Sequence, residues 1–253
     1  MIEIFLDYFW AARINLYYAG LSLPLGFIFA IFLAIGLTGD NKLTQRMSSG
    51  FVYVFRGSPL FIQLYLFYYA VRATGWPGYR PPGSFDRPYD FLLDALVLAP
   101  VVLLLNTAAY SAIIFANALR AVPRGDIEAA DAFGFSARKK FWRITWPTML
   151  RIAWPAYTNE AIFLFLSTAL VYASIPVTTR PGGANYKDVL VTANDIMEKS
   201  FNPFAAYLPA MAVFVVLTLI IFFFFGLVNA HLNRHLVRVG DRPRLSFRPN
   251  FIR

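Results

Sequence analysis

The fold class is decided by residues 14–39, which read INLYYAGLSLPLGFIFAIFLAIGLTG and carry no formal charge. A helix needs about 20 predominantly apolar residues to cross the hydrocarbon core of a bilayer, and this stretch exceeds that length. It is too long for the apolar core of a cleavable signal peptide, and no small-residue cleavage site leads from it into a soluble domain. The stretch therefore predicts a transmembrane helix near the N-terminus.

Four further apolar stretches follow along the chain. We expect spans at roughly 14–37, 50–71, 93–118, 156–177 and 207–230, with residues 119–155 forming a cytoplasmic loop. The residues through Trp10 are expected to form an amphipathic segment at the membrane interface. The predicted fold class is an all-α integral membrane protein, with residues 1–253 forming one transmembrane domain.

The composition supports the same class. Only 15% of the 253 residues are charged and 58% are hydrophobic, whereas about a quarter of a soluble domain is charged. The chain has no cysteine and two histidines, which excludes disulfides, thiolate nucleophiles and multi-histidine metal sites. The net charge of +9 is spread over short segments between the apolar stretches, not over a basic groove with interleaved aromatics, which excludes a nucleic-acid interface.

The lysine and arginine residues predict the orientation. Most of the 23 lie in the segments that follow the first, third and fifth spans. Cytoplasmic loops carry the excess of these residues. We therefore expect the N-terminus outside, the C-terminus in the cytoplasm, and the chain in the cytoplasmic membrane of a bacterium.

The loop between the third and fourth spans carries the most specific pattern. A short helix is predicted over 127–133, and Gly134 can adopt the positive φ that ends it. Ser136 is the predicted N-cap of a second helix that runs to about Ile144, with Pro147 stopping it. The loop also holds too many aromatic side chains for a solvated segment, which indicates a partner surface.

This loop resembles the EAA loop of ABC-importer permeases, with tryptophan at Trp146 where that family usually has leucine. The resemblance implies the type I importer fold and a loop that docks in a cleft of a cytoplasmic ATPase dimer, which would bind ATP and Mg. The residues implied to couple the two proteins are Glu128, Ala129, Ala130, Gly134, Ile144 and Pro147.

Three further segments resemble the polar amino-acid branch of these permeases: FRGSPL at 55–60 with Gln63-Leu64, Ala109-Tyr110, and PAYTNE at 155–160. They imply import of histidine, arginine, lysine or an opine, and a periplasmic or surface binding protein that contacts residues around 73–90 and 180–205. Many members have Glu and Arg where this chain has Ile113 and Ala116. Their absence resembles the "M" subunits, which pair with a different "Q" subunit, so a heterodimer is expected.

Polar residues within the spans are candidates for a substrate pathway: Gln63, Asn106, Tyr110, Glu160 and Thr168. Asn106, Tyr110 and Asn117 share one helical face. Interhelical hydrogen bonding explains such residues equally well, and for Glu160 a charge at the membrane interface is favoured. Two stripes of small residues, Gly26-Ala30-Ala34 and Ala108-Ala112-Ala116, are expected to allow close helix packing.

Arg56 allows two interpretations. A helix that continues through it would place a charge in lipid, which is costly. We favour a break in which Ser58 caps a new helix with Pro59 at its first position. Arg56 would then lie at the cytoplasmic interface, near an inner gate or a neighbouring carboxylate.

The sequence has no phosphate-binding GxxxxGK[ST] motif and no Ser/His/Asp arrangement. We therefore expect no enzyme activity and no cofactor in this chain, with energy supplied by a partner or an ion gradient. A self-sufficient secondary carrier or channel is the alternative, although inverted repeats, which would favour it, are not recognisable.

Overall fold

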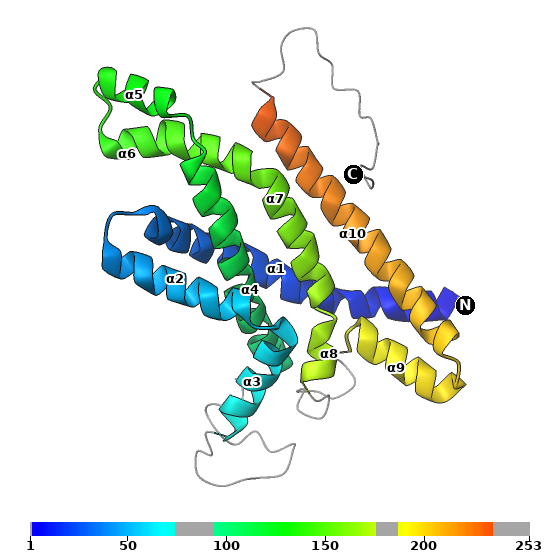
Figure 1. The fold of residues 1–253 in the computed structure, drawn as a ribbon. Coiled ribbons are helices and arrows are strands. Elements are labelled where there is room, and N and C mark those ends of the chain that lie inside the picture. Colours follow the sequence, from blue (N-terminus) through cyan, green and yellow to red (C-terminus); the bar gives the residue numbers. More distant parts are fainter. Residues whose placement is uncertain (1, 74–93, 176–186, 235–253) are drawn as a thin grey trace, which may run out of the picture.

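A computed structural model describes residues 2–73, 94–175 and 187–234, and every regular element in these ranges is helical (Figure 1). The elements are α1 (Ile2–Thr38), α2 (Lys42–Gly57), α3 (Leu60–Ala73), α4 (Ala95–Arg120), α5 (Arg124–Ala132), α6 (Ala137–Lys140), the π-helix η2 (Phe141–Thr145), α7 (Trp146–Ser167), α8 (Leu170–Ser174), α9 (Val189–Ser200) and α10 (Pro203–Asn233). The all-α prediction is confirmed. Much of the expected binding-protein contact, at 74–93 and 176–186, lies outside the described residues.

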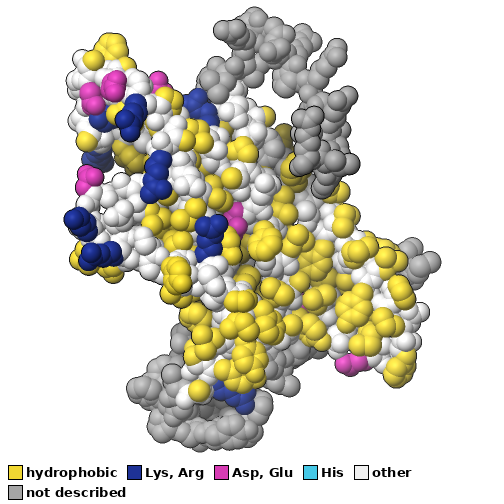
Figure 2. Space-filling view, in the orientation of Figure 1, with side chains coloured by type: hydrophobic (Ala, Val, Ile, Leu, Met, Phe, Trp, Pro, Cys, Tyr) yellow, Lys and Arg dark blue, Asp and Glu magenta, His cyan; other side chains and the backbone are white. Residues whose placement is uncertain are grey.

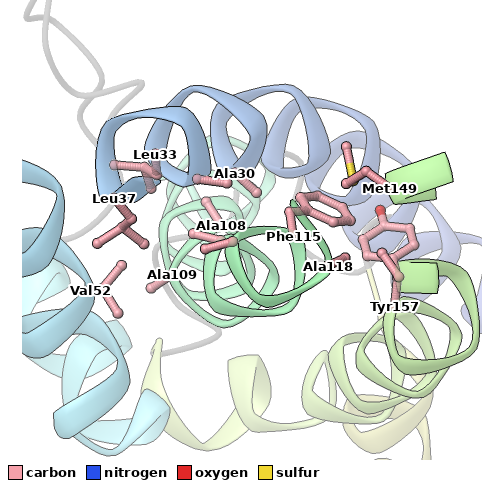
Figure 3. Packing of buried hydrophobic residues seen from close by; sticks show 14 of the residues in the cluster. Ala30, Leu33, Leu37, Val52, Ala108, Ala109, Phe115, Ala118, Met149 and Tyr157 are labelled. Carbon is pink, nitrogen blue, oxygen red and sulfur yellow. The ribbon is translucent and has the colours of Figure 1, made fainter. Parts of the chain in front are cut away.

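Helix α4 is the centre of the bundle, with α1, α2, α3 and α7 packed around it. Ala108, Ala112 and Ala116 of α4 are buried in one cluster with Ala30 and Ala34 of α1 (Figure 3). Small side chains let two helix backbones approach closely. Both predicted stripes of small residues therefore pack as expected.

Helix α1 is longer than the predicted first span. It runs unbroken from Ile2, so the residues through Trp10 belong to the same helix as the first span. Their expected place at a membrane interface stays a prediction. Packing explains why the helix begins so early. Tyr8, Ala11 and Ala12 are buried against α9 and α10, and the Tyr8 hydroxyl donates to the carbonyl of Ala206. These contacts fix the first turns of α1 as part of the bundle.

Three described helices are long and apolar enough to cross a membrane: residues 5–38 of α1, all of α4, and α10. The pair α2 and α3 would make a fourth span, bent by 103° at its break. The span expected at 156–177 falls on the second half of α7 and on α8, which are separated by a turn at Thr168 and Ala169. The fourth predicted span, at 156–177, thus stays a prediction.

Pro147 does not stop the second helix of the loop, so that expectation is wrong. The chain continues from α6 through η2 into α7, with Pro147 in the first turn of α7. Proline has no N–H and its ring clashes with the carbonyl four residues earlier. The wider π turn relieves this conflict, because the N–H of Trp146 bonds five residues back, to Phe141.

The surface separates into an apolar body and a charged end. Figure 2 shows hydrophobic side chains over the lower and right-hand parts of this face, and most of its charged side chains toward α5, α6 and the turn between α1 and α2. On α10 the central stretch is unburied, with exposed side chains such as Leu219, Ile220, Phe223 and Phe224. An apolar helix of this kind is suited to contact with lipid.

Candidate functional site

The turn between α5 and α6 is a rigid corner. Gly134 has φ of 69°, as predicted, and the N–H of Phe135 bonds to the carbonyl of Ala130 at 3.0 Å. This pair of features is the Schellman arrangement that ends helices. Ser136 is the predicted N-cap, its side chain accepting from the N–H of Lys139. Lys140 and Asp131 form a salt bridge of 2.6 Å across the corner.

The six predicted coupling residues divide into two groups. Glu128, Ala129 and Gly134 are exposed, whereas Ala130 is buried and Ile144 and Pro147 are half-buried. Large apolar side chains are also exposed beside them: Phe133 is 81% and Trp142 57% exposed. Exposed aromatics around a rigid corner form a surface suited to a protein partner.

The corner is joined to the bundle core without a flexible linker. From Ala137 to Ser167 the backbone is continuously helical, through α6, η2 and α7. Phe141, Trp142 and Trp146 pack around the π turn in edge-to-face and tilted arrangements, with ring centroids 5.4 to 6.2 Å apart. The corner and Glu160 therefore lie on one continuous helical segment.

The break between α2 and α3 is held by two amides. Gln63 Nε2 donates to the carbonyl of Phe55 at 2.7 Å and to the carbonyl of Ser58 at 3.0 Å. Asn106 Nδ2 donates to Phe55 O at 3.1 Å and to Gln63 Oε1 at 3.0 Å. These bonds satisfy carbonyls that the break leaves without helical partners.

The favoured break at Arg56–Pro59 is confirmed, but the expected cap is wrong. The first residue of α3 is Leu60, and the Ser58 hydroxyl donates back to the carbonyl of Val54 at 2.7 Å. Arg56 is exposed, and its Cζ lies 5.5 Å from the ring centroid of Tyr110. It also lines a cavity of about 380 Å³ beside Gly57, Val52 and Ile113.

Glu160 lies inside the bundle, not exposed at a membrane interface. It is 9% exposed, and its Oε1 accepts from the Thr107 hydroxyl at 3.0 Å. Thr107 and Tyr110 lie three residues apart on α4, which places them on one helical face. This face of α4 thus contacts Glu160 of α7 through Thr107 and Arg56 of α2 through Tyr110.

Thr168 lies apart from the other candidate pathway residues. It is fully buried at the turn between α7 and α8, and its Oγ1 accepts from Asn15 Nδ2 at 3.0 Å. The structure thus brings Gln63 and Asn106 into one contact, sets Glu160 and Arg56 on the Tyr110 face of α4, and places Thr168 elsewhere.

Two polar residues of this arrangement are missed by sequence reasoning. Thr107 follows Asn106 directly and contacts Glu160, and Asn15 lies in the first apolar stretch. The signal for Asn15 was available, since an amide in a span needs a hydrogen-bond partner. The spacing of polar residues along the sequence does not indicate that Thr107 bonds to Glu160 or that Asn15 bonds to Thr168, because each partner is more than 50 residues away.

Comparison with known proteins gives a consistent result. Residues 22–238 match the family model described as "Binding-protein-dependent transport system inner membrane component". The chain is 36% identical over 233 residues to the histidine/lysine/arginine/ornithine transport system permease protein HisM of Escherichia coli K12, covering 87% of this chain and 91% of that protein. It is 30% identical over 241 residues to the nopaline transport system permease protein NocM of Agrobacterium fabrum C58, covering 95% and 94%.

Solved structures share the fold. A chain of an amino acid ABC transporter crystallised with histidines superposes with a TM-score of 0.70 at 23% identity, covering 91% of this chain and 94% of that one. A chain of the inward-facing MetNI methionine ABC transporter gives a TM-score of 0.58 at 18% identity, covering 94% and 98%. At these identities the likeness concerns the fold alone.

Proposed function

Because this chain belongs to the family of binding-protein-dependent transport system inner membrane components, we propose that it imports a basic amino acid or an opine-like derivative with energy from ATP. Its relatives are permease subunits of amino-acid and opine ABC importers, and the chain is an M-type inner-membrane permease of that kind. The proposal adds the cargo, the partner chains and the residues that serve each of them.

The observation that carries the proposal is the helical connection from the exposed corner to the buried carboxylate. Glu128 and Gly134 stand on the surface of α5 and its turn, and Glu160 lies on α7, which continues from that corner without a break. A partner that moves the corner would therefore move Glu160 relative to α4. We assign the corner to a separate ATPase dimer, which binds ATP and Mg.

The cargo is inferred from two charged residues beside one face of α4, Arg56 of α2 and Glu160 of α7. An amino acid carries a carboxylate and an ammonium group, and a basic one carries a further cation. Arg56 suits the carboxylate, and Glu160 suits a cation of the cargo. Burial of Glu160 is costly while it has only the Thr107 hydroxyl to bond, and a cationic cargo would offset that cost.

Gln63 and Asn106 take a different part in this proposal. Both hydrogens of the Asn106 amide and the amide of Gln63 are used on the α2–α3 break. They hold the bend that brings Arg56 over Tyr110, so they shape the pathway without bonding the cargo. Pro59 contributes by lacking an N–H at the break.

The remaining partners are a second, unlike permease subunit and a binding protein outside the membrane. The second subunit is supported by the likeness to M-type permeases. The test is reconstitution of the co-purified complex in liposomes with labelled arginine, lysine or histidine. Uptake should require ATP and the binding protein and should persist when ion gradients are collapsed.

Two outcomes would contradict parts of the proposal. Uptake by this chain alone along an ion gradient, without ATP, would replace it with the secondary carrier. ATP-driven uptake of a sugar or a metal ion would leave the coupling assignment standing and would refute the assignment of Arg56 and Glu160 to an amino acid.

A further inference from the structure

A single buried amide joins three helical segments at the end of the bundle opposite the corner. Asn15 of α1 is fully buried. Its Nδ2 donates to Thr168 Oγ1 at 3.0 Å, and its Oδ1 accepts from the backbone N–H of Val189 at 3.1 Å. Thr168 marks the turn where α7 ends, and Val189 is the first residue of α9.

Both partners of Asn15 are groups that their own helices do not satisfy in full. The first four N–H groups of a helix have no partner within it. In α9 the Asp188 side chain accepts from the N–H of Val191, and the Asn15 side chain accepts from the N–H of Val189. Val189 is fully buried, so leaving its N–H unbonded would cost about 1–3 kcal/mol. The buried Thr168 hydroxyl donates to the carbonyl of Phe165 at 2.7 Å, and Asn15 supplies its second hydrogen bond. The amide therefore keeps the end of α7 and the start of α9 in register.

These two helices lead to opposite ends of the molecule. Helix α7 continues through η2 to the corner, whereas α9 ends at Ser200 on the far side of the bundle (Figure 1). The side chains of Glu198, Lys199 and Phe201 at that end of α9 are exposed. A partner bound there could act on α7 through α10, which packs against both helices, and through the hydrogen bonds of Asn15.

We propose that Asn15 is a positioning residue that couples α9 to α7, so that a binding protein docked on the α9 end changes the state of the corner. This inference rests on the proposed function, because it needs an ATPase at the corner and a binding protein outside. It assigns to Asn15 the transmission of the signal and no contact with the cargo.

The test uses the assembled complex in liposomes and compares ATP hydrolysis with and without the binding protein. Asn15→Leu removes both hydrogen bonds of the amide at similar volume. Thr168→Val removes the acceptor of Asn15 Nδ2 together with the local bond from the Thr168 hydroxyl to the carbonyl of Phe165. Each should lower the stimulation by the binding protein about 2- to 30-fold, the range expected for residues that carry coupling. Hydrolysis without the binding protein should stay unchanged. Because the two variants break one shared bond, the double variant should be no worse than the more affected single one.

Ser22→Ala is the matched control. Ser22 lies on α1, is fully buried, and donates to the carbonyl of Pro100 on α4 at 2.9 Å. The substitution therefore removes a comparable buried hydrogen bond without altering a contact to α7 or α9. Its stimulation should remain normal. Unchanged stimulation in both Asn15→Leu and Thr168→Val would overturn the inference. A loss in all three variants in proportion to their melting temperatures would do so too, since it would indicate a structural role only. Absent stimulation in the unaltered complex would instead refute the proposed function.

Discussion

At the scale of single residues, Glu160 shows how burial changes the meaning of a charge. Its backbone position, before the apolar part of the fourth predicted span, suggested a carboxylate exposed at the interface. The bond from Thr107 and the 9% exposure place it among α1, α4 and α7 instead. A buried carboxylate with one hydroxyl partner is expensive unless a cation joins it, and this makes it a testable cargo contact.

Replacing Glu160 with glutamine should weaken cargo binding while preserving the fold. Glutamine keeps the oxygen that accepts from Thr107 and removes the charge. Bonds to charged groups contribute about 1.5–3 kcal/mol, so the KM for a basic amino acid should rise about 10- to 100-fold in the liposome assay. Thr107→Ser retains the hydroxyl and should behave as the unaltered chain. An unchanged KM in Glu160→Gln would remove this carboxylate from the pathway.

A second residue-scale prediction concerns the closest approach of α1 and α4. A Cβ on Gly26 would lie 2.6 Å from Thr107 Cγ2 and 3.3 Å from the carbonyl oxygen of Leu104. Gly26→Ala should therefore destabilise the chain by about 1–3 kcal/mol through overpacking, measured as a lower melting temperature in detergent. Gly20→Ala on the same helix meets nothing within 4 Å and should be neutral or slightly stabilising. Equal melting temperatures for the two variants would contradict the close contact.

At the scale of elements, the corner between α5 and α6 is the feature that the local sequence specifies best. Gly134 and Ser136 act through backbone conformation and capping, which depend on neighbours within a few residues. Pro147 was misjudged because a π turn, in which the N–H of Trp146 bonds to Phe141, lets the helix continue past it, and no single position of the sequence reveals such a turn.

The same distinction explains the other elements. The break after Gly57 was predictable from Ser58-Pro59. The side-chain amides that hold it belong to Gln63 and to Asn106, and Asn106 is 51 residues away from its acceptor Phe55. The first turns of α1 show the same limit, because nothing in their local sequence indicates that Tyr8, Ala11 and Ala12 pack against α9 and α10. Residues within a few positions predict where helices end and turn, whereas contacts between distant residues determine which helix faces pack together.

Altering the corner should uncouple the transporter. Gly134→Asp places a side chain at φ of 69°, which strains an L-residue by about 1–2 kcal/mol, and Glu128→Lys reverses an exposed charge. Uptake should fall at least about tenfold in each, with membrane insertion and abundance unchanged. Gly125→Asp is the control, since it adds the same charge to the same loop, in the first turn of α5, where aspartate is favourable. Normal uptake by Gly134→Asp and Glu128→Lys would refute the docking role.

At the scale of the whole molecule, charge and hydrophobicity divide along one direction. Most charged side chains on the face in Figure 2 lie toward α5, α6 and the α1–α2 turn, and apolar side chains cover the remainder. The basic residues at the charged end include Lys42, Arg46, Arg138, Lys139 and Arg143. By the positive-inside rule we predict that this end faces the cytoplasm. The exposed end of α9 would then face outward, which is the orientation that both the ATPase and the binding-protein assignments require.

Cysteine labelling tests that orientation directly, and the chain has no native cysteine to remove. Ser200→Cys, at the exposed end of α9, should react with a membrane-impermeant maleimide added to intact cells. Ala137→Cys, exposed at the start of α6, should react only after the membrane is permeabilised. Both substitutions are at exposed positions, so neither should disturb packing, and permeabilised cells show that each thiol is reactive. The opposite pattern would place the corner outside, where no ATPase could dock, and would invert the direction in which α7 and α9 carry their signal.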